Sequence, residues 1–257
     1  MLGAIAGDIV GSVYEFQPIK SEEFPLFGPG SRFTDDTVMT VAVANAILEG
    51  SDYATEMKAF GRRYPDAGYG GSFIRWIFED AALPYNSWGN GAAMRVSPIG
   101  LAFNSVAQVL REAQLSAKVS HNHPEGIKGA QATALAVFLA RTGTEKEDIR
   151  HEITERFGYD LNRTVADVRP SYGFDVSCQG SVPEALIAFL DSRDYEDAVR
   201  KAVSLGGDSD TLACIAGGIA EAFYREIPPV IADTARLLLP KEFLAVVDRF
   251  RRIHPAG

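Results

Sequence analysis

The chain lacks long hydrophobic runs, a leader-like start and a set of cysteines. None of its apolar stretches reaches the roughly 18 residues that a membrane helix needs. The N-terminal segment MLGAIAGDIV carries an acid where a secretory signal needs a continuous apolar core. Of the two cysteines, Cys178 lies in a loop-like stretch and Cys214 in an apolar helical run. We therefore expect a cytoplasmic protein with two free thiols and no contact with a membrane.

Positive charge is also scarce. The 25 lysines and arginines are outnumbered by 34 aspartates and glutamates, giving a net charge of −9. The densest basic group, Arg249, Arg251 and Arg252, fits the solvated face of a helix. Binding to a nucleic acid backbone is therefore not expected. An anionic ligand would need metal ions, backbone N–H groups or single arginines to hold it.

Strand patterns, linkers and internal repeats are absent, whereas helical periodicity is common. We expect one all-α domain over residues 1–257, built as an orthogonal helical bundle around a central two-metal site. After an N-terminal helix, helices are predicted over 36–49, 54–64, 72–81, 105–118, 124–141, 145–157, 182–190, 195–204, 210–224 and 240–253. For the helix over 182–190, Ser181 is the predicted N-cap, with Pro183 in the first turn and Glu184 at the third position. Loops are predicted over 17–32, 84–95 and 162–180.

Two short acidic clusters stand out at predicted helix starts. Residues 34–37 read Thr-Asp-Asp-Thr, and residues 208–211 read Asp-Ser-Asp-Thr. Four carboxylates with threonine hydroxyls form an all-oxygen ligand set that suits Mg²⁺ or Mn²⁺ better than zinc or copper. The alternative is helix capping, for which Asp and Thr are ordinary residues. Capping needs only one acid, however, and the additional carboxylates repel one another unless a cation neutralises them.

Two more acids lie in the apolar N-terminal stretch. Asp8 and Glu15 are about two helical turns apart, so they can share one side of a helix. For Asp8, simple exposure and function remain equally open. Glu15 lies where the helix gives way to a loop, which favours a functional role. Gly206 and Gly207, before the second cluster, predict a close approach of the backbone to a ligand.

Taken with several glycine-rich pieces, these residues resemble the ADP-ribosylglycohydrolase family, of the dinitrogenase-reductase-activating glycohydrolase type. The resemblance covers roughly residues 1–225 in the family's order. Its pieces are Gly7-Asp8, Gly11-Ser12, Glu15, 33–37, 68–71, 89–95, Ser120-His121, 181–183 and 206–211.

The resemblance implies an all-α fold and a centre of two divalent cations, Mg²⁺ or Mn²⁺. The implied metal ligands are Thr34, Asp35, Asp36, Asp208, Asp210 and Thr211. The implied catalytic residues are Glu15, Asp35 and Asp36. The implied ADP-ribose pocket consists of Gly70, Gly71, Ser72, Ser87, Trp88, Gly89, Asn90, Gly91 and His121.

The chemistry of the pocket residues agrees with this expectation. Glycine N–H groups can donate to a diphosphate without adding charge. Trp88 offers a flat face to adenine or ribose, although core packing is an alternative. His121 is a donor near neutral pH, whereas His123 is expected to be structural or exposed. Arg95 is the least certain, because an arginine at a helix start can simply pair with a site carboxylate.

The expected reaction is hydrolysis of a glycosidic bond of an ADP-ribosyl group, on a protein or on a small conjugate. Glu15 is the candidate for proton transfer. A binding or structural protein on the same scaffold is the main alternative, and the complete ligand set disfavours it. A phosphohydrolase is a third possibility, disfavoured because no lysine or arginine lies beside either acidic cluster. The linkage, the preferred metal and the oligomeric state stay open, although residues 11–15 look most like family members acting on O-linked ADP-ribose.

Overall fold

The computed structural model describes residues 1–81 and 83–255, and their secondary structure is helical. Among these residues the single β-type contact is an isolated antiparallel bridge between Gly89 and Ser177. The all-α prediction is confirmed. The helices are α1 (Leu2–Gly11), α2 (Asp35–Glu49), α3 (Tyr53–Arg63), α4 (Gly71–Phe78), the 3₁₀ helix η1 (Asn90–Ala92), α5 (Ser97–Ala102), α6 (Val106–Lys118), α7 (Pro124–Arg141), α8 (Lys146–Phe157), α9 (Val165–Val168), α10 (Cys178–Leu190), α11 (Tyr195–Ser204), α12 (Ser209–Tyr224), α13 (Pro229–Leu237) and α14 (Lys241–Ile253).

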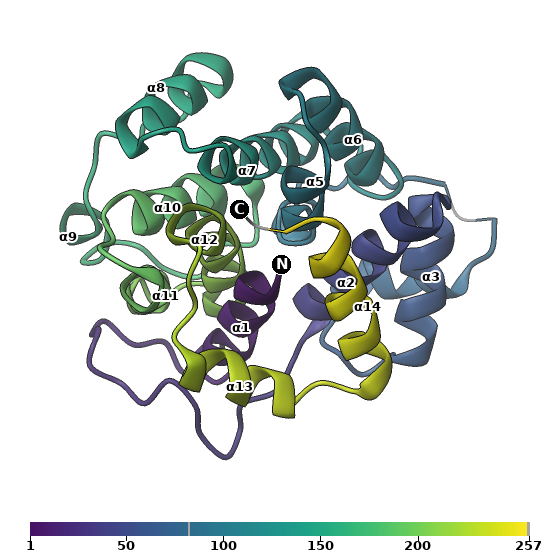
Figure 1. Cartoon of the computed structure of the whole chain (residues 1–257), viewed down its shortest axis with the longest axis horizontal. Helices are drawn as coiled ribbons and strands as arrows, with labels where there is room; N and C mark the ends of the chain where they lie inside the picture. Colours follow the sequence, from purple (N-terminus) through teal and green to yellow (C-terminus); the bar gives the residue numbers. More distant parts are fainter. Residues whose placement is uncertain (82, 256–257) are drawn as a thin grey trace.

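The centre of the molecule is a close pairing of α1 with α12, the first helix with a late one (Figure 1). Glycines at every fourth position of α1 make this possible. A Cβ atom at Gly7 would lie 2.1 Å from the Ala213 carbonyl oxygen, and one at Gly11 would lie 2.3 Å from the Ser209 carbonyl oxygen. No side chain fits in either space. The two backbones therefore touch, and residues on α1 and at the start of α12 are held at short range.

Helix α2 packs beside this pair and carries the first acidic cluster. Its residues are buried almost all round, as its continuous apolar sequence predicts. The side chain of Thr34 caps it by accepting a hydrogen bond from the Asp36 N–H. Gly50 ends it with a left-handed backbone, φ +63°.

The start of α10 was predicted wrongly. Ser177 is its N-cap instead of Ser181, and the helix begins at Cys178 rather than at 182. Pro183, read as a first-turn residue, lies inside the helix and leaves one backbone hydrogen bond unmade. Cys178 is therefore a buried helical residue and not part of a loop, whereas Cys214 lies in a helix as expected. Both thiols are free.

Three short α-helices were missed, as was the 3₁₀ helix η1, which lies within the predicted loop 84–95. Both α5 and α13 have a proline within their first two positions, where proline is favourable. They were missed because the glycine and proline residues around them were taken as loop signals. The four-residue α9 lies within a predicted loop and begins with a capping box formed by Thr164 and Asp167. Conversely, α4 ends at Phe78, before the predicted position 81. No helix in the described part of the chain is long and apolar enough to cross a membrane.

Candidate active site

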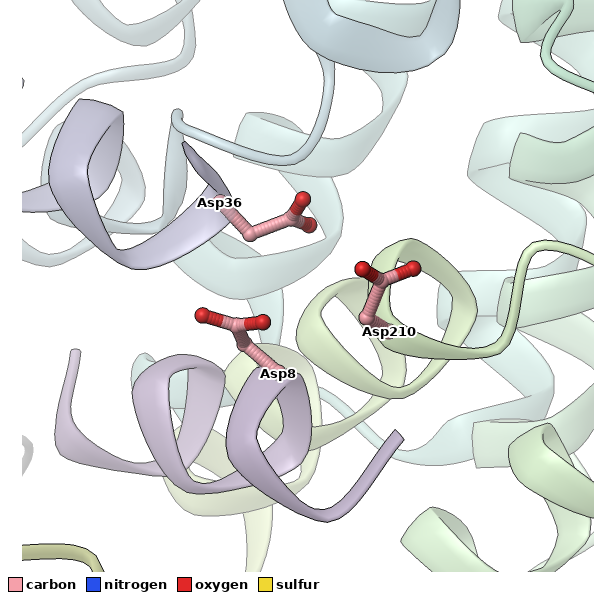
Figure 2. Close-up of side chains that lie close together, drawn as sticks. All are labelled: Asp8, Asp36 and Asp210. Atoms are coloured by element: carbon pink, nitrogen blue, oxygen red, sulfur yellow. The ribbon is translucent and has the colours of Figure 1, made fainter. Parts of the chain in front are cut away.

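Three central helices bring three buried aspartates together. Asp8 on α1, Asp36 at the start of α2 and Asp210 at the start of α12 point toward one another (Figure 2). One carboxylate oxygen from each lies within 4.8 Å of the others. A second group of the same kind consists of Glu15, Asp208 and Asp210. Asp210 belongs to both groups, so the two acidic clusters of the sequence form one continuous carboxylate site.

Helix capping does not explain this arrangement. Thr34 does cap α2, but Asp208, in the N-cap position of α12, makes no capping hydrogen bond. Its carboxylate instead accepts a 2.7 Å hydrogen bond from the Asn90 side-chain amide. Oδ1 of Asp36 is buried and has no hydrogen-bond partner among the described residues. An orphaned carboxylate oxygen facing other carboxylates is the feature that a cation would satisfy.

Asp8, which the sequence left undecided, is fully buried and holds the start of α2. It accepts hydrogen bonds from the N–H and hydroxyl of Thr34, at 2.9 and 2.7 Å, and from the N–H and hydroxyl of Thr37. The Thr34 hydroxyl proton is thus committed to Asp8. The Thr34 oxygen also accepts from the Asp36 N–H in capping α2, which leaves one lone pair for another partner.

The acidic groups strongly resist ionisation in the absence of a cation. Burial raises the pKa of Asp35, Asp36 and Asp210 well above the ordinary value, and neighbouring carboxylates raise it further. Burial raises the pKa of Asp208 to about 6. The pKa of Glu15 rises to about 7 through burial and the charge of Asp210, with partial relief from Arg32.

The carboxylates of the site suit hard divalent cations, which prefer oxygen ligands. Carboxylates at such short range must carry protons or neutralise a cation, and both groups of candidate ligands consist of carboxylates. This agrees with the metal dependence expected from the sequence. The number and identity of the ions stay a prediction. Asp35, a predicted ligand, belongs to neither three-carboxylate group.

A cavity of about 530 Å³ opens over these carboxylates. All the predicted site residues line it except Thr34, which lies buried beside Asp8. The lining that the prediction contained comprises Glu15, Asp35, Asp36, Gly70, Gly71, Ser72, Ser87, Trp88, Gly89, Asn90, Gly91, His121, Asp208, Asp210 and Thr211. The lining that it did not assign comprises Gly68, Phe73, Tyr85, Asn86, Met94, Arg95, Phe174 and Val176.

The 87–91 loop is fastened to the chain before α10. The Asn90 N–H donates to the Val176 carbonyl at 2.8 Å, and the Cys178 N–H donates to the Trp88 carbonyl at 2.9 Å. With the hydrogen bond from Asn90 to Asp208, these contacts join the loop both to α10 and to the carboxylate site. Sequence reasoning missed Phe174 and Val176 because they lie in a loop with no periodic pattern.

Two aromatic side chains stand open at the cavity. Trp88 is 47% exposed and Phe174 is 56% exposed, so the core-packing alternative for Trp88 is wrong. Large exposed rings at a cavity are characteristic of ligand contacts. The pair Gly206-Gly207 departs from its prediction: it packs against Lys20 and Tyr172 and does not line the cavity.

The expectations for Arg95 and the other nearby cations also need correction. Arg95 is fully buried and pairs with no carboxylate of the described residues; it donates to the Ser116 carbonyl and the Ser120 hydroxyl. It lines the same cavity as the acids, and the charge of Arg32 acts on Glu15. The argument against a phosphohydrolase from missing positive charge is therefore weaker than the sequence indicated. His123, as expected, is structural, since its ring accepts from the Glu125 N–H at the start of α7.

Comparisons with known proteins agree with this geometry. The ADP-ribosylglycohydrolase family profile matches residues 1–254. The human ADP-ribosylhydrolase ARH3 is 30% identical, with 87% of this chain and 84% of that protein covered. The ADP-ribosylarginine hydrolase Tri1 of Pseudomonas putida is 27% identical, over 87% of this chain and 69% of that protein.

A solved structure described as an ADP-ribosylglycohydrolase-related protein complex has the same fold. Its TM-score is 0.75 at 25% identity, covering 98% of this chain and 97% of that one. The likeness thus extends over the whole chain in both sequence and structure. This chain belongs to the ADP-ribosylglycohydrolase family and is a hydrolase of ADP-ribosyl conjugates.

Proposed function

We propose that the cavity binds an ADP-ribosyl group and that the carboxylate site hydrolyses its glycosidic bond, releasing ADP-ribose. The observation that carries the proposal is one cavity with two kinds of lining. Carboxylates gather around Asp210, while the same cavity presents glycine backbone, open aromatic rings, His121 and Arg95. A ligand with vicinal hydroxyls, an anionic diphosphate and a flat base matches all of these features.

Two divalent cations, Mg²⁺ or Mn²⁺, would be held by Thr34, Asp35, Asp36, Asp208, Asp210 and Thr211. When bound, they supply a Lewis acid that lowers the pKa of water and engages ribose hydroxyls. The sharing of Asp210 between two carboxylate groups supports a pair of ions. Asp8 acts on this site by fixing Thr34.

Glu15 is the proposed proton-transfer group. Burial and the charge of Asp210 raise its pKa to about 7 in the metal-free protein, and it lines the cavity, where a carboxyl can take a proton from the attacking water or give one to the departing atom. Positive charge develops on the ribose ring as the glycosidic bond breaks. The surrounding carboxylates stabilise that charge, which is one reason for having more acids than the cations alone need.

Trp88 and Phe174 are proposed to contact the base or a ribose, and the loops 70–72 and 87–91 to surround the phosphates. The exposed rings lie at the cavity, and glycine N–H groups donate to phosphate oxygens without adding bulk. The partner is thus an ADP-ribosylated protein or small conjugate. We also propose that residues 1–257 act as one domain in a reducing cytoplasm, consistent with one continuous core and two free thiols.

Loss of one central carboxylate tests the metal site. Asp36→Ala or Asp210→Ala is expected to abolish Mn²⁺ binding, followed by calorimetry, together with ADP-ribose release. Asp233→Ala, which removes an exposed carboxylate on α13, is the matched control and should change neither. If Asp36→Ala or Asp210→Ala, freed of metal, still released ADP-ribose at the full rate, the proposal would be contradicted.

A further inference from the structure

A buried arginine, Arg95, borders the cavity and has no carboxylate partner in residues 1–81 and 83–255. Arg95 is fully buried, and its Nη2 donates to the Ser116 carbonyl at 2.8 Å and to Ser120 Oγ at 3.2 Å. Its Nε and Nη1 have no partner among the described residues. The guanidinium carbon lies 5.7 Å from the centre of the Phe73 ring. Burial lowers the Arg95 pKa only to about 10, so the group stays charged at neutral pH.

The charge of Arg95 dictates what the Ser120 hydroxyl does. A guanidinium only donates, so Ser120 Oγ accepts from it. The remaining contact of this hydroxyl is Nδ1 of His121, at 2.8 Å. If Nδ1 carried a proton, the buried hydroxyl would have no acceptor for its own proton among the described residues. The assignment that gives the Ser120 hydroxyl proton an acceptor has Ser120 donating to Nδ1.

This fixes the other ring nitrogen of His121. With Nδ1 accepting, the proton of a neutral imidazole is on Nε2. Nε2 faces the 87–91 loop, 3.1 Å from where a Cβ atom at Gly91 would lie and 3.6 Å from one at Gly89. No hydrogen bond in the described part of the chain uses Nε2, although the ring lines the cavity. Burial and the Arg95 charge both lower the His121 pKa, which keeps the ring neutral.

We propose that Arg95 and Ser120 are positioning residues that lock His121 as a neutral donor, with its Nε2–H offered to an oxygen of the ligand. Because Arg95 places a positive charge beside the same cavity, an anionic oxygen is favoured over a neutral one. On the proposed function, that oxygen belongs to the diphosphate of the ADP-ribosyl group. The lock itself is a property of the free protein and does not depend on the reaction.

Nitrogen NMR of the four histidines reads the tautomer directly. In the ¹⁵N-labelled full chain near neutral pH, the His121 ring is expected to show an unprotonated Nδ1 and a protonated Nε2. The missing signal in a His121→Gln sample assigns the resonance. A protonated Nδ1, an even mixture of tautomers or a charged ring would overturn the proposal.

Two serines on the same short stretch provide a matched pair. Ser120→Ala removes the hydroxyl that bonds His121 and is expected to convert its ring to a mixture of tautomers. Ser116→Ala removes a buried hydroxyl that has no hydrogen-bond partner among the described residues, since Arg95 bonds the Ser116 carbonyl, and should leave the His121 ring unchanged. Equal spectra for wild type and Ser120→Ala would contradict the lock. If Ser120→Ala does not fold, the wild-type spectrum alone decides.

Binding of ADP-ribose, measured by calorimetry with Mn²⁺ present, tests the ligand contact without requiring turnover. A glutamine amide can replace an Nε2 donor, whereas an asparagine amide reaches only the Nδ1 position. We expect His121→Asn to weaken binding roughly tenfold or more, which is the loss expected for a hydrogen bond to a charged group. We expect His121→Gln to weaken binding by no more than about threefold. Equal loss in both variants would overturn the donor role. If the spectra confirm the lock but no conjugate is hydrolysed, the proposed function fails and the lock stands.

Discussion

At the scale of single residues, Glu15 is the group on which the proposed chemistry depends most. Glu15→Gln keeps the size and polarity of the side chain but cannot exchange a proton. We expect turnover to fall by about 10²-fold or more, the usual contribution of general acid–base catalysis. Glutamine keeps one side-chain oxygen beside Asp208 and Asp210, so binding of Mn²⁺ and ADP-ribose should fall far less than turnover, as calorimetry on the same sample would show. Normal turnover by this variant would contradict the role of Glu15.

A second residue-scale prediction concerns Asp8. In Asp8→Asn, an NH₂ group replaces one of two oxygens that together accept four hydrogen bonds from Thr34 and Thr37. A buried donor then faces other donors. We expect a loss of about 2–4 kcal/mol in the free energy of unfolding.

Urea denaturation of metal-free protein measures the Asp8 effect and separates it from any loss of metal. Asp233→Ala, remote and exposed, is the control. An unchanged urea midpoint for Asp8→Asn would show that these hydrogen bonds do not hold the start of α2.

Some residues of the site could be predicted from the sequence and others could not. Residues 34–37 and 208–211 were recognisable because acids beside threonines, repeated in two places, are chemically unusual. Arg95 was not, because the sequence shows neither its burial nor its partners. Phe174 was missed for a related reason: exposure at a cavity depends on how a loop lies, and residues 162–180 carry no periodic signal.

At the scale of elements, the pairing of α1 with α12 determines whether the site forms. Gly3, Gly7 and Gly11 all lie where a Cβ atom would strike the backbone or side chains of α12. Gly7→Ala would force the helices apart and separate Asp8 from Asp210.

We expect Gly7→Ala to lower the free energy of unfolding by about 3 kcal/mol or more, beyond the 1–3 kcal/mol typical of overpacking, because the clash is with backbone. Thermal unfolding followed by circular dichroism would measure it. Gly28→Ala, with nothing within 4 Å of the added atom, is the control. Similar melting of both variants would contradict the close pairing.

Most elements were predictable because the apolar residues of an amphipathic helix recur at helical spacing, and a fully buried helix shows a long apolar run. The bounds of α7 and α11 follow the sequence without error. The predicted start of α10 was wrong because the sequence has typical helix-start residues at Ser181, Pro183 and Glu184. Ser177, four residues earlier, forms the actual cap. A proline within a helix is tolerated here by the surrounding packing, which a local pattern cannot show.

At the scale of the whole molecule, the buried acids link stability to pH and metal. Their pKa values are raised in the folded state, so the fold binds protons that the unfolded chain releases. Asp208 and Glu15 therefore lower the free energy of unfolding as pH rises. The loss is absent below about pH 4 and grows until pH passes their folded pKa values of about 6 and about 7. Metal-free protein should therefore melt at higher temperature near pH 5 than near pH 8.

Bound Mn²⁺ should reduce or reverse that trend, because a cation replaces the protons and its binding strengthens as pH rises. Differential scanning calorimetry with Mn²⁺ or EDTA across this pH range is the measurement. Asp197 and Asp248, whose pKa values are lowered by ion pairs, act in the opposite sense, but only at more acid pH. A metal-free melting temperature that rises steadily with pH would contradict the linkage.

The central claim is that one metal-dependent cavity releases ADP-ribose from a conjugate. The most direct measurement is hydrolysis of ADP-ribose linked through arginine, serine or acetyl, with Mg²⁺, Mn²⁺ or EDTA present. Release of ADP-ribose from at least one linkage, abolished by EDTA and restored by added metal, is the predicted result. No release from any linkage by protein shown to hold metal, or release that EDTA leaves unchanged, would contradict the account.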